Sequence, residues 1–113
     1  MSQKIINMLL ATVLFTTMLY ANQPSFDCAK VKKESSEALI CSSDELMDLD
    51  KELAAVYKQA LPKATKDDML IAHQRGWIKG RNDCWKADNE KKCMADTYRL
   101  RIKELKEKFG ERK

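Results

Sequence analysis

The sequence is poor in residues that break helices and in residues that perform chemistry. Its 113 residues include three glycines, two prolines and one histidine. It has no glycine-rich phosphate-binding loop and no cysteine pair spaced C-x-x-C, so it predicts no nucleotide site and no zinc site with the usual ligand spacing. The histidine, His73, has no serine or cysteine nucleophile placed beside it by sequence. We therefore predict a protein that is not an enzyme, with no catalytic residue, metal or cofactor.

A strong excess of one charge is also missing. The sequence has 21 Lys and Arg against 17 Asp and Glu, a formal net charge of +4, and both signs alternate along the chain. No basic patch is interleaved with aromatic residues, so nucleic acid is not a predicted partner.

The first residues have the pattern of a secretory signal. Lys4 precedes an almost wholly apolar stretch over residues 5–20, and the small residue Ala21 gives a cleavage point before Asn22. The alternative is an uncleaved anchor, but the apolar core is short for a spanning helix, which needs ~20 residues. We therefore expect a signal peptide over residues 1–21 and one mature domain over residues 22–113. This domain would be periplasmic or secreted, and it would meet the membrane only through its signal peptide.

All four cysteines, namely Cys28, Cys41, Cys84 and Cys93, lie in the predicted mature domain. An even number of cysteines in an exported domain indicates two disulfides.

The periodic signal in the mature domain is helical throughout. A short helix is expected near residues 34–40. The Ser-x-x-Glu pattern of Ser42 and Glu45 predicts a capping box at the start of the next helix. That helix carries an apolar stripe and ends before Pro62. The stripe consists of Leu46, Leu49, Leu53, Val56, Tyr57 and Ala60.

Two further helices are expected. One starts near Thr65, with a stripe formed by Leu70, Gln74, Trp77, Arg81 and Cys84. A polar turn over residues 85–89 leads to the last helix, near residues 90–109, where Gly110 occupies the C-terminal cap position. The predicted fold is all-α, a small antiparallel three-helix bundle with a short extra N-terminal helix and two disulfides.

Two disulfide pairings fit this bundle. The first joins Cys28 to Cys41 and Cys84 to Cys93, and the second joins Cys28 to Cys93 and Cys41 to Cys84. We favour the first, because a step of nine residues across a turn closes easily. It requires residues 29–33 to fold back, since a continuous helix would separate Cys28 from Cys41 by ~20 Å.

Several polar side chains lie on the borders of the apolar stripes, and we expect them to form a structural network. Asp50, Arg81, Arg101 and Gln74 are its predicted members. An arginine can bridge a carboxylate through two parallel hydrogen bonds, which would fix the register of the helices. The aromatic residues expected in the core are Tyr57, Trp77 and Tyr98.

At these residues the sequence resembles the LprI-like lysozyme-inhibitor family of bacterial envelope proteins. The similar stretches are Phe26-Asp27-Cys28-Ala29-Lys30, Glu37-Ala38-Leu39-Ile40-Cys41-Ser42, Leu49-Asp50-x-x-Leu53-x-x-x-Tyr57, Gln74-Arg75-x-Trp77-x-x-x-Arg81-Asn82-x-Cys84 and Cys93-Met94-x-x-x-Tyr98-x-x-Arg101-Ile102-x-x-Leu105. The resemblance covers residues 24–105. One departure is the longer, charged turn over residues 85–92.

The resemblance implies an exported, non-enzymatic, mainly helical domain, with lysozyme inhibition attributed to some members. It assigns no inhibitory residue here. We consider the turn with Trp85, Lys86, Lys91 and Lys92 as a candidate partner contact, since cationic groups in a disulfide-held loop suit a cleft with two carboxylates. The alternative function is an envelope interaction or chaperone-like module with a partner other than lysozyme.

Overall fold

The structure is a computed structural model that describes residues 24–110, and this part of the chain contains helices and no strands. The predicted signal peptide, residues 1–21, lies outside the described residues. The α-helices are α2 (Ser36–Cys41), α3 (Asp44–Ala60), α4 (Leu70–Asn82) and α5 (Glu90–Phe109). Short 3-10 turns connect or precede them, namely η1 (Cys28–Lys30), η2 (Leu61–Lys63), η3 (Lys66–Asp68) and η4 (Asp83–Lys86).

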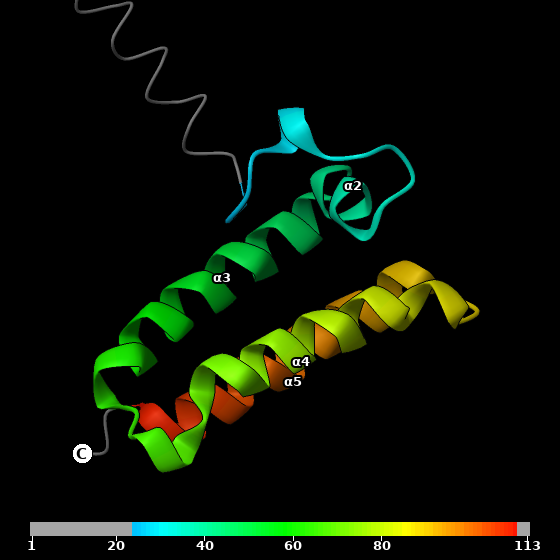
Figure 1. The fold of residues 1–113 in the computed structure, drawn as a ribbon. Helices are drawn as coiled ribbons and strands as arrows, with labels where there is room; N and C mark the ends of the chain where they lie inside the picture. The colour runs from blue at the N-terminus through cyan, green and yellow to red at the C-terminus, as the bar shows by residue number, and fades with distance from the viewer. Residues whose placement is uncertain (1–23, 111–113) are drawn as a thin grey trace, which may run out of the picture.

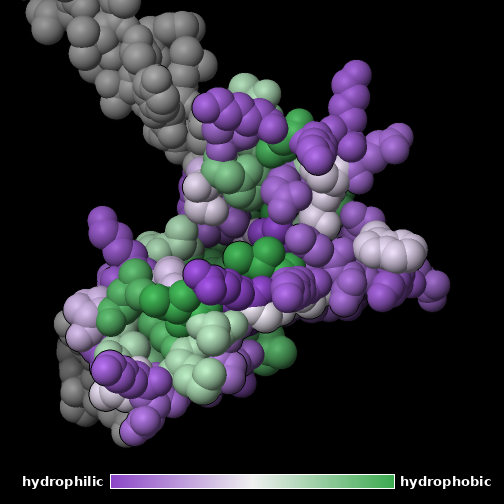
Figure 2. Space-filling model, viewed as in Figure 1, coloured by the Kyte–Doolittle hydropathy of each residue, from purple (hydrophilic) through white to green (hydrophobic). Residues whose placement is uncertain are grey.

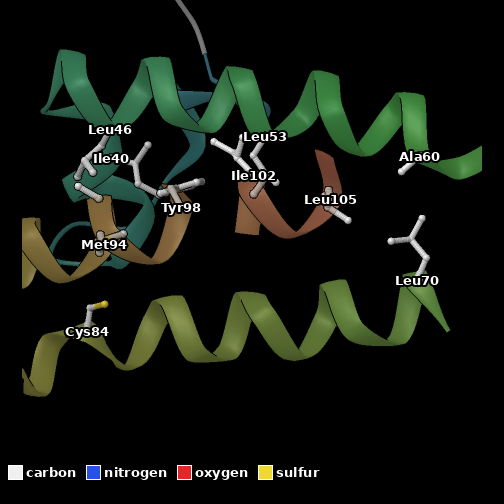
Figure 3. Packing of buried hydrophobic residues seen from close by; sticks show 11 residues of the cluster. Ile40, Leu46, Leu53, Ala60, Leu70, Cys84, Met94, Tyr98, Ile102 and Leu105 are labelled. Carbon is white, nitrogen blue, oxygen red and sulfur yellow. The ribbon is translucent and has the colours of Figure 1, made fainter. Parts of the chain in front are cut away.

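The three long helices alternate in direction (Figure 1), with α3 and α5 running the same way and α4 opposed to both. α5 lies between α3 and α4 (Figure 3) and packs against each of them, whereas α3 and α4 have almost no backbone contact with each other. The all-α prediction of three main helices with a short N-terminal helix is confirmed.

The core forms around α5, which contributes more buried apolar side chains than any other described helix. Tyr98 and Met94 are fully buried, as are Ile40 of α2 and Leu46 of α3 (Figure 3). The remaining core residues are Leu53, Ala60, Leu70, Cys84, Ala95, Ile102 and Leu105. Since α5 is covered by α3 on one side and α4 on the other, it needs a wider apolar face than they do.

The predicted capping box at the start of α3 is wrong by one residue. Ser43 is the N-cap, and its hydroxyl accepts the Leu46 backbone N–H at 3.2 Å. Ser42 instead closes α2, where its own hydroxyl donates to the Leu39 carbonyl. Two adjacent serines can share the two roles because only one residue separates α2 from the cap of α3.

The start of α4 was predicted five residues too early. Thr65 and Asp68 form a capping box, but it caps the start of the 3-10 turn η3 and not the start of α4. Met69 follows with a φ of 50°, in the left-handed region, and its backbone cannot continue a right-handed helix. α4 therefore begins only at Leu70.

Both disulfides follow the first of the two pairings. Cys28 is bonded to Cys41 and Cys84 to Cys93, with Cα–Cα distances of 5.8 and 5.6 Å. The first bond requires the chain between η1 and α2 to fold back, and it does so around Glu34, whose φ is 64°. Both bonds lie at the end of the bundle where α3 and α5 begin and α4 ends.

Candidate functional site

A buried polar chain crosses the bundle beneath the side where α3 and α4 stand apart. The Tyr98 hydroxyl donates to Asp50 Oδ1 at 2.8 Å and accepts from Arg81 Nη1 at 3.2 Å. Arg81 Nη2 in turn donates to Glu37 Oε1 at 2.9 Å. Asp50 Oδ2 accepts the backbone N–H of Ser25 at 2.6 Å. These bonds link the N-terminal segment and all four described α-helices through one hydroxyl group.

The charged side chains of the buried polar chain need hydrogen-bond partners because they are removed from water. Asp50 and Arg81 are each 5 % exposed, and an isolated charge in such a position would be costly. Burial raises the pKa of Tyr98 well above its ordinary value, the Asp50 carboxylate raises it further, and the Arg81 guanidinium opposes the shift. The phenol therefore remains a neutral hydrogen-bond donor to Asp50.

The predicted network of Asp50, Arg81, Arg101 and Gln74 is in fact two groups. Arg101 Nε donates to Gln74 Oε1 at 2.9 Å, and Nη1 of Arg101 lies 3.6 Å from Glu104 Oε2. Asp50 and Arg81 are not bridged directly, because the Tyr98 hydroxyl lies between them.

Sequence reasoning missed three participants of the buried chain. Glu37 is 44 positions from Arg81, and the Ser25 N–H is a backbone group, so helical periodicity indicates neither. Tyr98 was predicted as a core aromatic, but its hydroxyl was not predicted to join the network. Its only available signal was that a buried tyrosine hydroxyl needs a partner.

The polar chain lies at the floor of a hollow of about 220 Å³ between α3 and α4. The hollow is lined by Ser25, Asp50, Leu53, Ala54, Tyr57, Gln74, Trp77, Ile78 and Arg81. Trp77 packs edge-on against Tyr98, with ring centroids 4.9 Å apart, and its Nε1 donates to the Thr97 carbonyl at 3.2 Å. Within residues 24–110 no hydrogen bond engages the Tyr57 hydroxyl or the Gln74 side-chain NH₂ group. Tyr57 and Trp77 are therefore half-buried walls of a hollow, rather than fully buried core residues.

A second exposed feature is the turn over residues 83–89, which joins α4 to α5 and is closed by the Cys84–Cys93 disulfide. We call this turn the tip. Trp85 is 66 % exposed, and the Lys86 ammonium lies 5.6 Å from the centroid of its ring. The turn predicted at residues 85–89 is partly the 3-10 turn η4. Lys91 and Lys92 belong to the first turn of α5, where Lys92 pairs with Asp96 at 2.8 Å. The structure therefore does not place the four candidate contact residues in one loop.

The described residues bring together no group of three His, Cys, Asp or Glu side chains that could hold a metal ion. No helix between residues 24 and 110 has the length and apolar character needed to cross a membrane. The four cysteines are all bridged.

Comparison with known proteins assigns the chain to a family. The family model described as lysozyme inhibitor LprI matches residues 28–105. This chain belongs to the LprI lysozyme inhibitor family. Both disulfides, the buried polar chain from Glu37 to Tyr98, and the tip lie within the matched residues.

Curated relatives include the proteins named lipoprotein LprI from Mycobacterium bovis and Mycobacterium tuberculosis. Each is 28 % identical to this chain over 106 residues, in an alignment that covers 85 % of this chain and 53 % of the relative. The chain thus spans about half the length of these LprI relatives. No solved structure matches it.

Proposed function

We propose that this LprI-family chain acts outside the cytoplasm as a binding protein that inhibits a lysozyme and has no catalytic activity of its own. The family match over residues 28–105 is the observation that carries the proposal. The two disulfides support the compartment, because such bonds persist in oxidising environments. Periplasm and cell exterior both meet that condition.

The tip is the surface that best fits the cleft of a glycosidase. Trp85 is the most exposed large hydrophobic residue of residues 24–110, and tryptophan is enriched among residues that dominate binding energy. The disulfide one residue before it holds the turn in place, which lowers the entropy lost on binding. Lys86 brings a cation next to the ring, and glycosidases position two carboxylates at the bond they cleave. A tip that places an indole and an ammonium group in that cleft would exclude the sugar chain.

The test is a muramidase assay with the purified mature protein and a panel of lysozymes. We expect inhibition of at least one enzyme, and a rise in the inhibition constant of about 10- to 30-fold for Trp85→Ala, as for a binding hot spot. Lys86→Ala should weaken inhibition less, because the Lys86 side chain is 62 % exposed and its Nζ already lies 3.7 Å from Asp83 Oδ1.

Leu100→Ala is the matched control, since Leu100 is 60 % exposed but lies on α5, away from the tip. It should leave inhibition unchanged. Absence of inhibition at micromolar excess over every enzyme in the panel would refute the proposed function. Inhibition that is equally strong in Trp85→Ala would refute the role of the tip alone.

A further inference from the structure

Two hollows lie on the side of the bundle between α3 and α4. Besides the hollow above Tyr98, a second hollow of about 350 Å³ lies where α3 ends and α4 begins. It is lined by Leu61, Ala64, Thr65, Lys66, Met69, Leu70, Ile71 and Ala72. We call the two hollows together the α3–α4 groove. Helix α5 packs against both α3 and α4, so the groove lies on the side of these two helices that α5 does not cover.

The groove exposes most of the large apolar side chains on the described surface. Leu61, Met69, Ile71 and Ile78 are 41, 58, 54 and 38 % exposed, and each of them lines one of the two hollows. Figure 2 shows hydrophobic side chains gathered where α3 ends and α4 begins. A contiguous apolar surface of this kind marks an interaction site more often than an accident of composition.

The α4 edge of this groove is basic. Helix α4 contains no acidic residue from Leu70 to Asn82. Arg75 lies four residues after Ile71 and three before Ile78, so it shares their side of the helix. Arg75 and Lys79 are exposed, and neither forms an ion pair with any residue from 24 to 110.

The α3 edge also carries an exposed cation. Lys58 lies four residues after Ala54, which lines the groove. The acidic residues Glu45 and Glu52 are directed to the other side of α3, where they bind Arg99 at 2.6 Å and Lys106 at 3.1 Å on α5. Asp50, which does line the groove, is buried and has both oxygens bonded. Exposed cations therefore lie beside the apolar hollows on both α3 and α4.

We propose that the α3–α4 groove binds an amphipathic helix of a partner protein whose flanking residues are acidic. Because α3 and α4 pack on α5 but hardly on each other, a fourth helix could lie between them, as in a four-helix bundle. Binding of an apolar helix face in a groove is a common recognition mode. Acidic flanks would complement Arg75, Lys79 and Lys58. The 13 residues of α4 make the groove about 20 Å long, which suits a helix of three to four turns.

The two hollows also set the spacing of the side chains that would anchor the helix. On the α3 side the hollows are represented by Tyr57 of α3 and Leu61 of η2, four residues apart, and on α4 by Ile71 and Ile78, two turns apart. Anchors at positions i and i+4 or i and i+7 of the bound helix match these separations. The site differs from the tip with Trp85 and does not depend on lysozyme binding.

The test uses two synthetic helical peptides of about four turns, with the same leucine stripe at i, i+4, i+7 and i+11. One peptide has glutamate flanks and the other has lysine flanks. Fluorescence anisotropy with the mature protein should show at least tenfold tighter binding of the glutamate peptide. Arg75→Glu and Ile71→Ser should each weaken its binding about tenfold or more, while circular dichroism shows unchanged melting. Both side chains are mostly exposed, so the fold should tolerate these changes.

Matched controls are Lys103→Glu and Leu100→Ser, which change the same residue classes on the exposed surface of α5. They should leave peptide binding unchanged. Equal affinity for both peptides, no binding of the glutamate peptide at millimolar concentration, or insensitivity to Arg75→Glu would overturn the proposal. A third arm uses vesicles containing an anionic phospholipid. Binding to vesicles that is lost in Arg75→Glu, without binding of the glutamate peptide, would show that the groove meets a membrane surface instead.

The lysozyme assay separates this proposal from the proposed function. Trp85→Ala should leave peptide binding unchanged, and Arg75→Glu should leave inhibition unchanged.

Discussion

The hydroxyl of Tyr98 is a single atom on which the buried polar chain depends, and Tyr98→Phe removes it without changing the shape of the ring. The variant would deprive Asp50 Oδ1 of its donor at 2.8 Å and Arg81 Nη1 of its acceptor at 3.2 Å. Water cannot readily replace either bond, because Tyr98 is fully buried and its two partners are each 5 % exposed.

The expected loss follows from the charge of both partners. A hydrogen bond to a charged group contributes about 1.5–3 kcal/mol, and leaving a buried partner unsatisfied costs about as much. Because Asp50 retains Ser25 and Arg81 retains Glu37, we expect the free energy of unfolding to fall by about 2–3 kcal/mol rather than by the sum of two bonds. In a small domain this corresponds to a fall in Tm of roughly 8–24 °C.

Urea unfolding followed by circular dichroism measures this loss. The control is Tyr57→Phe, since no residue between 24 and 110 forms a hydrogen bond with the Tyr57 hydroxyl, and its free energy of unfolding should change by less than about 0.5 kcal/mol. Equal midpoints for the two variants would refute the argument that the Tyr98 hydroxyl joins the helices. A double-mutant cycle with Asp50→Asn should further show a coupling of at least about 1 kcal/mol between the two side chains.

Three further predictions follow from the structure. The folded-state pKa of Tyr98 is raised above the ordinary value of 10.0. The neutral phenol therefore contributes fully to the free energy of unfolding below pH 10.0, and this contribution is lost as the pH rises through the folded-state pKa. Absorbance at alkaline pH should therefore show the Tyr98 phenol ionising together with unfolding, and Tyr98→Phe should lose that step. The pair Cys84→Ser and Cys93→Ser opens a loop with a sequence separation of 9 and should lower the free energy of unfolding by about 2.5 kcal/mol, whereas an unchanged Tm would contradict this. The Thr65 backbone N–H and, secondarily, Lys108 lower the pKa of Asp68. The stabilisation of wild type over Asp68→Asn should accordingly be present at neutral pH and shrink as the pH falls below the ordinary value of 3.8; a constant difference in Tm across that range would exclude the linkage.

The helices could be predicted from sequence because each long helix has one apolar face. The stripe that starts at Leu46 includes Leu53 and Ala60, and all three residues are buried in α3. Helical periodicity depends only on residues within the same element, so a single sequence contains that signal completely.

The features that were missed depend on contacts or on backbone conformation between elements. The capping box of Thr65 and Asp68 exists, but the left-handed Met69 after it delays α4, and nothing in a methionine indicates positive φ. The link from Glu37 to Arg81 joins residues whose proximity exists only once α2 is folded back on the bundle. The openness between α3 and α4 was equally invisible, because an apolar stripe does not state which neighbour will cover it.

The two disulfides lie in separate parts of the chain, and neither of them joins these parts to each other. Cys28–Cys41 closes a loop before α3, and Cys84–Cys93 closes the turn between α4 and α5. Neither spans residues 61–69, so this connection is the single covalent tether between α3 and the hairpin of α4 and α5. A protease that cut after the exposed Lys63 or Lys66 would leave two pieces, each with its own crosslink, held together only by noncovalent contacts such as α3 packing on α5 and the Glu37–Arg81 ion pair. The resistance of the oxidised protein to proteolysis therefore depends on how rarely the chain opens locally at this connection, and not on its crosslinks.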